Sequence, residues 1–113
     1  MNPRIYIAGP MTGLPDLNYP AFNAEAARLR AAGWEVENPA ENTAPPSGEW
    51  IDYMRLAIPQ LLTCEILVLL PGWFASRGAR TEKRIAEVFA MRWYVEGEIG
   101  WHPLNDPEMA DKW

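Results

Sequence analysis

Glu65–Leu70 reads EILVLL, a nearly continuous apolar run, and this stretch decides the fold class. A strand that helices cover on both faces is apolar throughout, whereas a strand with one face in water alternates apolar and polar residues. A second run, Arg4–Ala8 (RIYIA), is β-branched and aromatic and stops at Gly9-Pro10, as expected of a buried strand entering a turn. The two runs predict a parallel sheet between layers of helices.

Helical patterns and breakers separate these strands. From Pro20 to Ala32 apolar residues recur at helical spacing, and Gly33 suits the position just past a helix end. Trp34–Glu37 predicts another strand, which Asn38-Pro39 ends because proline cannot continue the ladder. The first half of the chain therefore reads as strand, helix, strand.

The second half repeats this alternation. A polar loop at Ala40–Gly48 leads into a helix that starts near Glu49, and Pro59 should kink this helix or divide it into two pieces. After the apolar run the sequence predicts three more elements: a loop at Pro71–Gly78, an amphipathic helix at Ala79–Met91 and a possible last strand at Trp93–Val95. Such alternation implies right-handed crossovers and a doubly wound α/β sheet of four or five strands with helices on both faces.

Length and composition narrow the remaining choices. The 113 residues suit a single domain, with a core at about residues 4–95 and an unassigned tail at 96–113. The net charge of −5 gives no attraction to polymeric nucleic acid or anionic membranes, and no apolar stretch approaches the roughly 20 residues that span a bilayer. The single cysteine, Cys64, suits a cytoplasmic setting. No metal-ligand spacing or dinucleotide fingerprint indicates a metal or cofactor, and His102 is read as structural.

Two loops follow the carboxyl ends of strands, where open parallel sheets bind ligands. In Gly9–Tyr19, glycines let backbone approach a ligand and Thr12 offers a hydroxyl, although a tight turn explains these residues equally well. After Pro71, free N–H groups at a helix start can hold a phosphate or carboxylate together with Ser76 and Arg77 or Arg80. The alternative is that Ser76 only caps the helix and the arginines are solvated.

Glu82 lies about one turn into that helix, so its carboxylate can point back toward the strand ends. A carboxylate there can attack or stabilise an oxocarbenium-like carbon, as in sugar-transfer chemistry. A capping or dipole role is the ordinary explanation for a glutamate near a helix start. Both alternatives remain open from the residues alone.

Four segments together resemble a small phage and prophage family of the nucleoside 2-deoxyribosyltransferase-like superfamily. They are IYIAGPMTG (Ile5–Gly13), NYPAFN (Asn18–Asn23), LRAAGWEVENPAE (Leu29–Glu41) and LLPGWFASRGARTE (Leu69–Glu82). The resemblance implies a flavodoxin-like fold, a homo-oligomer whose interface some of the six tryptophans should cover, and Glu82 as nucleophile toward a 2-deoxynucleoside or its 5′-monophosphate. The expected substrate-binding residues are Tyr6, Gly9, Met11, Thr12, Gly13, Asp52, Trp73, Ser76, Arg77, Gly78 and Arg80.

Two departures from the superfamily's pattern bear on activity. Ala57 stands where relatives carry an acid in the second helix, and Asp52 lies five residues earlier on another part of the helical face. Before Glu82, where transferases place another Asp, this chain has Trp73-Phe74, which can stack on a base. We therefore expect an N-glycosidase or deoxyribosyltransferase, with a catalytically silent nucleotide-binding protein or an interaction protein with a vestigial pocket as alternatives.

Overall fold

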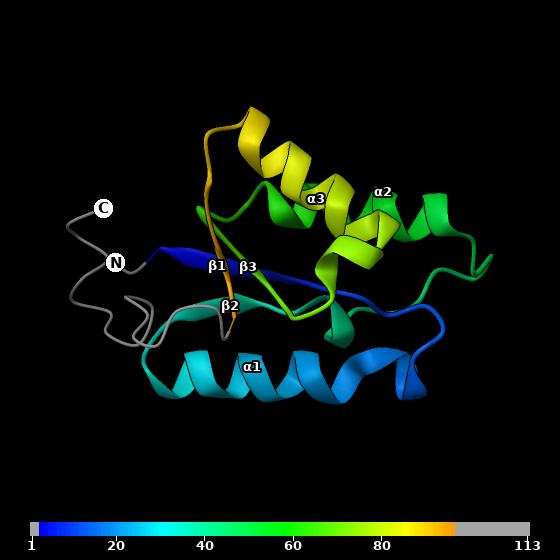
Figure 1. Cartoon of the computed structure of the whole chain (residues 1–113), viewed down its shortest axis with the longest axis horizontal. Coiled ribbons are helices and arrows are strands. Elements are labelled where there is room, and N and C mark those ends of the chain that lie inside the picture. The colour runs from blue at the N-terminus through cyan, green and yellow to red at the C-terminus, as the bar shows by residue number, and fades with distance from the viewer. Residues whose placement is uncertain (1–2, 97–113) are drawn as a thin grey trace.

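The computed structural model describes residues 3–96, which form a sheet between two layers of helices (Figure 1). The sheet has four strands in the order β2-β1-β3-β4, and every neighbouring pair is parallel. The strands are β1 (Arg4–Ala8), β2 (Glu35–Glu37), β3 (Ile66–Leu69) and β4 (Arg92–Val95). The predicted α/β class is confirmed, and the change in strand order between β1 and β3 is that of a flavodoxin-like fold.

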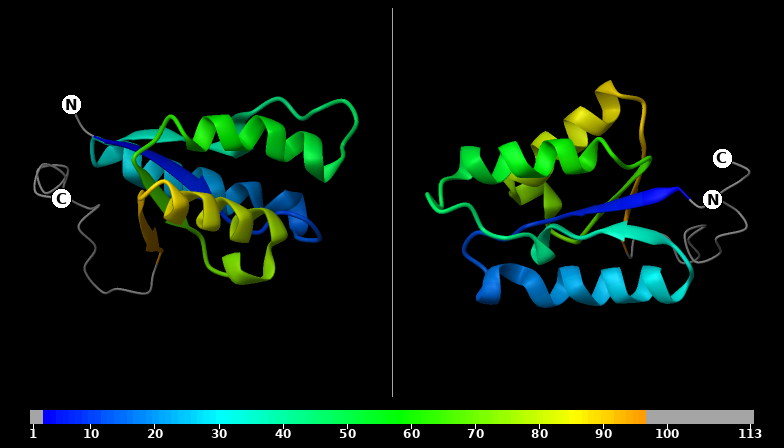
Figure 2. Two further views of the ribbon diagram at one scale, coloured as in Figure 1. Left: turned by 90° about the horizontal axis from the view of Figure 1, so that it is seen from above. Right: turned by 180° about the vertical axis from the view of Figure 1, so that it is seen from behind.

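The α-helices cover both faces of the sheet, as predicted. Helix α1 (Tyr19–Ala31) lies on one face, and α2 (Trp50–Leu61) and α3 (Arg77–Val88) lie side by side on the other (Figures 1 and 2). Short 3-10 turns complete the connections at Pro15–Asn18, Pro39–Glu41 and Trp73–Ala75. None of the helices in residues 3–96 is long and apolar enough to cross a membrane.

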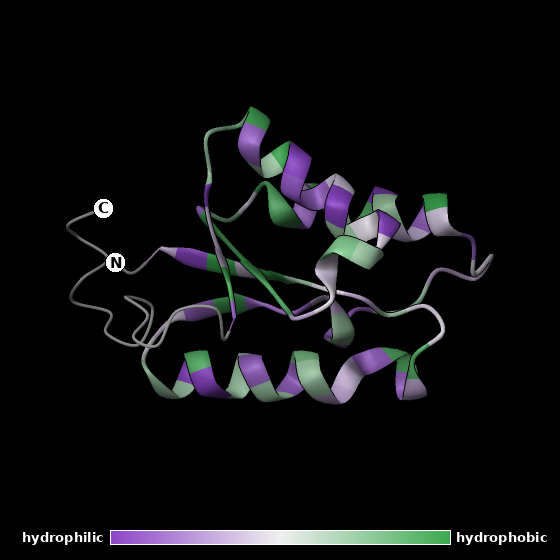
Figure 3. Ribbon diagram, in the orientation of Figure 1, coloured by the Kyte–Doolittle hydropathy of each residue, from purple (hydrophilic) through white to green (hydrophobic). Residues whose placement is uncertain are grey.

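The alternation of side chains along β1 builds two separate cores. Ile5 and Ile7 point to the α1 side and pack in one cluster with Phe22. Tyr6 points to the opposite side and belongs to a second cluster that contains Ala79 of α3. Successive side chains of a strand face opposite ways, so a strand covered on both sides must be apolar throughout. Strand β3 meets this requirement along its whole length (Figure 3).

Most predicted boundaries differ from the structure by one residue, and the largest difference is at the end of α3, which stops at Val88 rather than Met91. Helix α3 begins at Arg77 rather than Ala79, because Ser76 ends the preceding turn and accepts a hydrogen bond from the Ala79 N–H. The predicted division of the second helix is wrong, since α2 runs continuously to Leu61 with Pro59 in its last turn. A proline this close to the helix end removes one intrahelical hydrogen bond but leaves most of the helix before it intact.

The tryptophans occupy different environments. Trp34 is in the core, Trp50 and Trp73 are partly buried, and the side chain of Trp93 is exposed. Trp101, Trp113 and the histidine at position 102 lie outside the described residues. The homo-oligomer stays a prediction that light scattering can check.

Gly9, just past the end of β1, lies against the side chain of Leu70, just past the end of β3. A Cβ at this position would lie 2.8 Å from the Cβ of Leu70. Gly9→Ala should therefore lower the free energy of unfolding by about 1–3 kcal/mol, measured by urea denaturation. In the control Gly78→Ala, the added Cβ meets its nearest neighbour at 3.5 Å, so stability should stay the same or rise by up to about 1 kcal/mol. Equal stability of the two variants would contradict the close approach at Gly9.

Candidate functional site

The two loops predicted to bind a ligand lie next to each other. The Leu70 N–H donates to the Ala8 carbonyl oxygen over 2.8 Å, which joins the ends of the two central strands. Just beyond, a Cβ on Gly72 would lie 3.5 Å from the Pro10 side chain. The carboxyl ends of β1 and β3 therefore open into one site.

Glu82 is the charged side chain that the fold buries at this site. It has 6% of its surface exposed, and it lies on the same buried face of α3 as Ala79 and Ala86. The three positions are spaced three and four residues apart, so the packing of α3 against the sheet carries the carboxylate inward. Tyr6 of β1 meets it there through a hydrogen bond between the two side chains.

Burial controls the ionisation of this pair. Loss of water raises the pKa of Glu82 to about 7, and the hydrogen bond with Tyr6 acts in the opposite direction. The pKa of Tyr6 lies well above its usual value because of burial first and the nearby Glu82 charge second. Tyr6 is thus protonated at neutral pH and donates to the carboxylate, whose pKa burial moves toward neutrality.

One oxygen of this carboxylate has no partner. Oε2 of Glu82 is buried and makes no hydrogen bond to any other described residue. Buried polar atoms are nearly always hydrogen-bonded, because an unsatisfied one carries its full desolvation cost. The fold thus buries a carboxylate oxygen whose hydrogen-bonding capacity the described residues leave unsatisfied. Glu82 is not the capping glutamate of the ordinary explanation, since Ser76 caps α3 and Glu82 lies deeper in the helix.

The beginning of α3 contributes hydrogen-bond donors. Ser76 Oγ accepts from the Ala79 N–H over 3.1 Å and keeps its own proton to donate elsewhere. The N–H groups of the first helical residues, Arg77 and Gly78, precede the first intrahelical hydrogen bond. The capping role expected for Ser76 is therefore real, and it leaves donors free for an anion.

The two arginines of this segment have different contacts. Arg80 donates to the Phe74 carbonyl oxygen over 2.9 Å and so braces the preceding turn. The Cζ atom of Arg77 lies 3.7 Å from the ring centroid of Trp50 in α2. Neither side chain is simply solvated, and only Arg77 lies between α2 and the start of α3.

The first loop, which the resemblance implies binds substrate, is partly exposed. Thr12 and Gly13 are on the surface, whereas Gly9 is buried and Met11 packs partly against the core. Further on, Asp16, Leu17 and Asn18 adopt left-handed φ angles of 51°, 53° and 60°. Side chains other than glycine pay about 1–2 kcal/mol each for this conformation, so the loop is strained where it enters α1.

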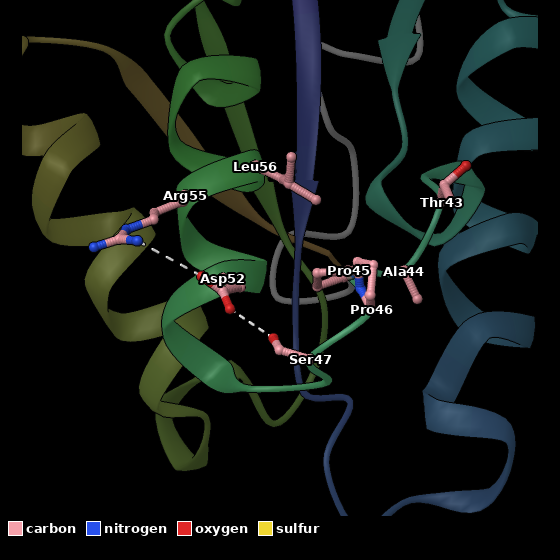
Figure 4. A pocket seen from close by; sticks show the side chains of 8 residues that line it. All are labelled: Thr43, Ala44, Pro45, Pro46, Ser47, Asp52, Arg55 and Leu56. Carbon is pink, nitrogen blue, oxygen red and sulfur yellow. Dashed lines mark hydrogen bonds and ion pairs between the residues drawn. The ribbon is translucent and has the colours of Figure 1, made fainter.

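Asp52 lies in a different place from the buried carboxylate. It accepts a hydrogen bond from the Ser47 hydroxyl over 2.6 Å, and one of its oxygens is 3.7 Å from Arg55 (Figure 4). These residues line an open groove of about 500 Å³ between α2 and the proline-containing loop before it, and Glu82 is not part of its lining. Ala57, in contrast, packs against the cluster that contains Tyr6. The position without an acid thus packs against the core, and the available acid lies at the groove.

Trp73 is held beside the site rather than free. Its ring packs against the second core and contacts Phe74 edge to face with 6.2 Å between the ring centroids. Lys83 Nζ lies 5.4 Å from the centroid of Trp73 and 4.3 Å from that of Trp93. Such cation–π contacts fix the ring orientation.

Trp50 and Met54 are near the site, although the sequence indicated only that they belong to a helix. A Cβ on Gly78 would lie 3.5 Å from Met54 Sδ and 3.6 Å from Trp50 Nε1. The spacing of four residues on α2 predicted a shared face but not the element that this face contacts. Within residues 3–96, no three His, Cys, Asp or Glu side chains come together as ligands for a metal.

A family model described as a domain of unknown function, DUF4406, matches residues 3–95. The chain belongs to the DUF4406 family. The matched range includes both site loops and Glu82, so the DUF4406 domain is the whole described fold. No curated protein matches the chain. The likeness to the nucleoside 2-deoxyribosyltransferase-like superfamily and the phage setting stay predictions.

Proposed function

We propose that this protein cleaves the N-glycosidic bond of a 2-deoxynucleoside or its 5′-monophosphate, with Glu82 as the nucleophile. The observation that carries the proposal is the unsatisfied oxygen of the buried Glu82 carboxylate, which is hydrogen-bonded to Tyr6 of the central strand β1. A carboxylate that attacks carbon needs an oxygen lone pair directed at the substrate, and an oxygen without a hydrogen bond has its lone pairs available. Oε2 is such an oxygen.

The chemistry would proceed in two displacements. In the first, Oε2 of Glu82 forms a bond to the anomeric carbon while the bond from that carbon to the base nitrogen breaks. The base leaves with the bonding electron pair and takes up a proton from solvent. In the second, water or another base attacks the anomeric carbon, loses its proton to solvent and returns the electron pair of the ester bond to Glu82, as in retaining glycosidases. Water gives hydrolysis, and a second base gives transfer.

Tyr6 has a supporting role in this proposal. Its hydroxyl donates to one carboxylate oxygen and so stabilises the ionised form that attacks. It also fixes the orientation of the carboxylate from the rigid central strand β1. The other oxygen is left for the substrate.

A panel of 2′-deoxynucleosides and their 5′-monophosphates tests the proposal. We expect free base to appear in chromatograms for at least one member of the panel, in proportion to the protein concentration. Release at the same rate in samples without protein would be background hydrolysis. No release above that background across the panel would contradict the proposal.

Ala57 favours a second candidate, a protein that binds a nucleotide without cleaving it. This residue stands where relatives carry the acid that orients the sugar or protonates the leaving base, and it packs against the core cluster that contains Tyr6. The nearest acid in α2, Asp52, is occupied by Ser47 and Arg55. Thermal stabilisation by nucleotides together with no base release would support this candidate.

A further inference from the structure

The charges of this chain are unevenly distributed. Residues 77–92 contain five of its ten lysines and arginines but only two of its fifteen acidic residues, and one of those two, Glu82, is buried. The rest of the chain therefore carries the excess of negative charge. The net charge of −5 gives no overall attraction to a polyanion, but the outer surface of α3 is locally positive.

The exposed arginines of α3 have no carboxylate partners. Arg77, Arg80 and Arg84 are spaced three and four residues apart, so they form one stripe on the side of α3 that faces away from the sheet. None of them makes an ion pair with a carboxylate among residues 3–96. Four other arginines do have such a partner: Arg4, Arg28, Arg30 and Arg55. Like charges at these spacings destabilise a helix, and an anionic partner would offset the repulsion.

Aromatic side chains border this stripe. Trp73 and Phe74 meet edge to face with 6.2 Å between their ring centroids. Lys83 Nζ lies between two indoles, 5.4 Å from the centroid of Trp73 and 4.3 Å from that of Trp93. Arg80 donates to the Phe74 carbonyl oxygen over 2.9 Å. These contacts join the turn at Trp73–Ala75, the outer side of α3 and β4 into one cationic–aromatic surface, which also includes Arg84.

The exposed aromatic rings of residues 3–96 all belong to this part of the chain. Phe74, Phe89 and Trp93 have 67%, 61% and 41% of their surface exposed. The exposed leucines and isoleucines lie elsewhere, in the first loop and on or just after α2: Leu14, Leu17, Ile51, Leu56 and Leu62. An apolar polypeptide can pack against aliphatic and aromatic side chains alike, whereas a nucleobase stacks on flat π faces. The aromatic rings and the unpaired cations therefore favour the same kind of partner.

We infer that the cationic–aromatic surface binds a single strand of nucleic acid. The Cβ atoms of residues four apart on a helix, such as Arg80 and Arg84, are about 6 Å apart, which is close to the interval between adjacent phosphates of an extended strand. Phe74 and Trp93 offer faces on which bases can stack. Proteins that bind single strands without sequence preference combine these two features. The surface is on the opposite side of α3 from Glu82, so this binding is separate from the proposed reaction.

Fluorescence anisotropy with a labelled oligodeoxythymidylate of about twelve nucleotides tests the inference. The wild type should bind it at low salt with a Kd between about 1 and 100 µM. The logarithm of the association constant should fall with the logarithm of the salt concentration with a slope of about −2, as expected for three phosphate contacts. A duplex that contains the same strand should bind at least about tenfold more weakly, because its base faces are already stacked.

Two variants separate the phosphate contacts from the stacking. Arg84→Gln removes one phosphate contact and should reduce the magnitude of the salt slope by about 0.7. Phe74→Ala removes a stacking face and should weaken binding about tenfold without changing the slope. Both side chains are exposed, so both variants should fold. Arg55→Gln and Leu56→Ala replace an exposed cation and an exposed apolar side chain on α2, and as matched controls they should bind like the wild type.

Competition identifies the bound partner and its position. Unlabelled oligouridylate should compete as well as oligodeoxythymidylate, because both offer phosphates and base faces, and polyglutamate should compete poorly. Equal competition by polyglutamate would overturn the inference in favour of an acidic polypeptide. Displacement of the strand by excess thymidine 5′-monophosphate would also overturn it, by placing the strand at Glu82. So would the absence of binding at low salt, or an unchanged affinity and salt slope in both Arg84→Gln and Phe74→Ala.

Discussion

Glu82→Gln is expected to lower the rate of base release by a factor of about a thousand or more while the protein remains folded. The amide has nearly the same shape as the carboxylate, but it cannot supply the electron pair that forms the bond to the anomeric carbon. The side chain is buried between α3 and Tyr6 of β1, so no water can replace it in the same position. The measurement is kcat for the best substrate of the nucleoside panel, by chromatography of free base.

Glu87→Gln is the matched control for this experiment. Glu87 lies on the exposed side of the same helix, where it makes a 3.0 Å ion pair with Lys83. Removing a single surface ion pair changes stability by less than about 1 kcal/mol and should leave kcat unchanged. Unchanged turnover in Glu82→Gln would mean that another group attacks the sugar and that Glu82 has a structural role.

The layers and strand order of this fold follow from a few sequence features. The apolar run of β3 required cover on both faces, and the structure buries each of its residues. Parallel strands need crossovers, and the two helical patterns between the first and third strands supplied them. The sequence did not predict the ends of the helices and strands correctly. Gly78 reads as a breaker, yet it lies within the first turn of α3, where a helix has no intrahelical N–H bonds to lose.

The site was predictable to the extent that it depends on strand ends. The loops after β1 and β3 had to meet because parallel strands point the same way, and Glu82 had to be near them if the helix after β3 packs on the sheet. The contact of Trp50 with Arg77 depends instead on how α2 crosses α3. Periodicity gives the apolar face of each helix but not its crossing angle or rotation. Ala57 and Asp52 differ in the same way, since only the packed structure shows that Ala57 packs against the second core and that Asp52 pairs with Arg55.

The burial of Glu82 should also be visible in the pH dependence of stability. The folded pKa of about 7 lies above the ordinary value of 4.5, so the folded protein binds this proton more tightly than the unfolded chain. The free energy of unfolding of the wild type therefore falls as pH rises from about 4.5 to about 7. Above that range the contribution of this proton to stability is completely lost. A difference of this size corresponds to about 3 kcal/mol.

Glu82→Gln removes the ionisable group, so the variant does not lose stability through ionisation at this position. The free energy of unfolding of the variant, minus that of the wild type, should increase by roughly 2–3 kcal/mol between pH 5 and pH 8. Urea denaturation at several pH values measures this difference, in which the contributions of all other titrating groups cancel. The buried amide changes the difference by a constant amount but not its slope.

Glu41→Gln provides a control of the opposite kind. The hydrogen bond from Arg30 lowers the pKa of the exposed Glu41, so its contribution to stability is lost only as pH falls below the ordinary range of a carboxyl group. Its difference from the wild type should be flat between pH 5 and pH 8. A flat difference for Glu82→Gln as well would mean that water reaches the carboxylate in solution. The position would then lack the dry environment that makes an ionised carboxylate reactive toward carbon, because solvation weakens a nucleophile as it stabilises its charge.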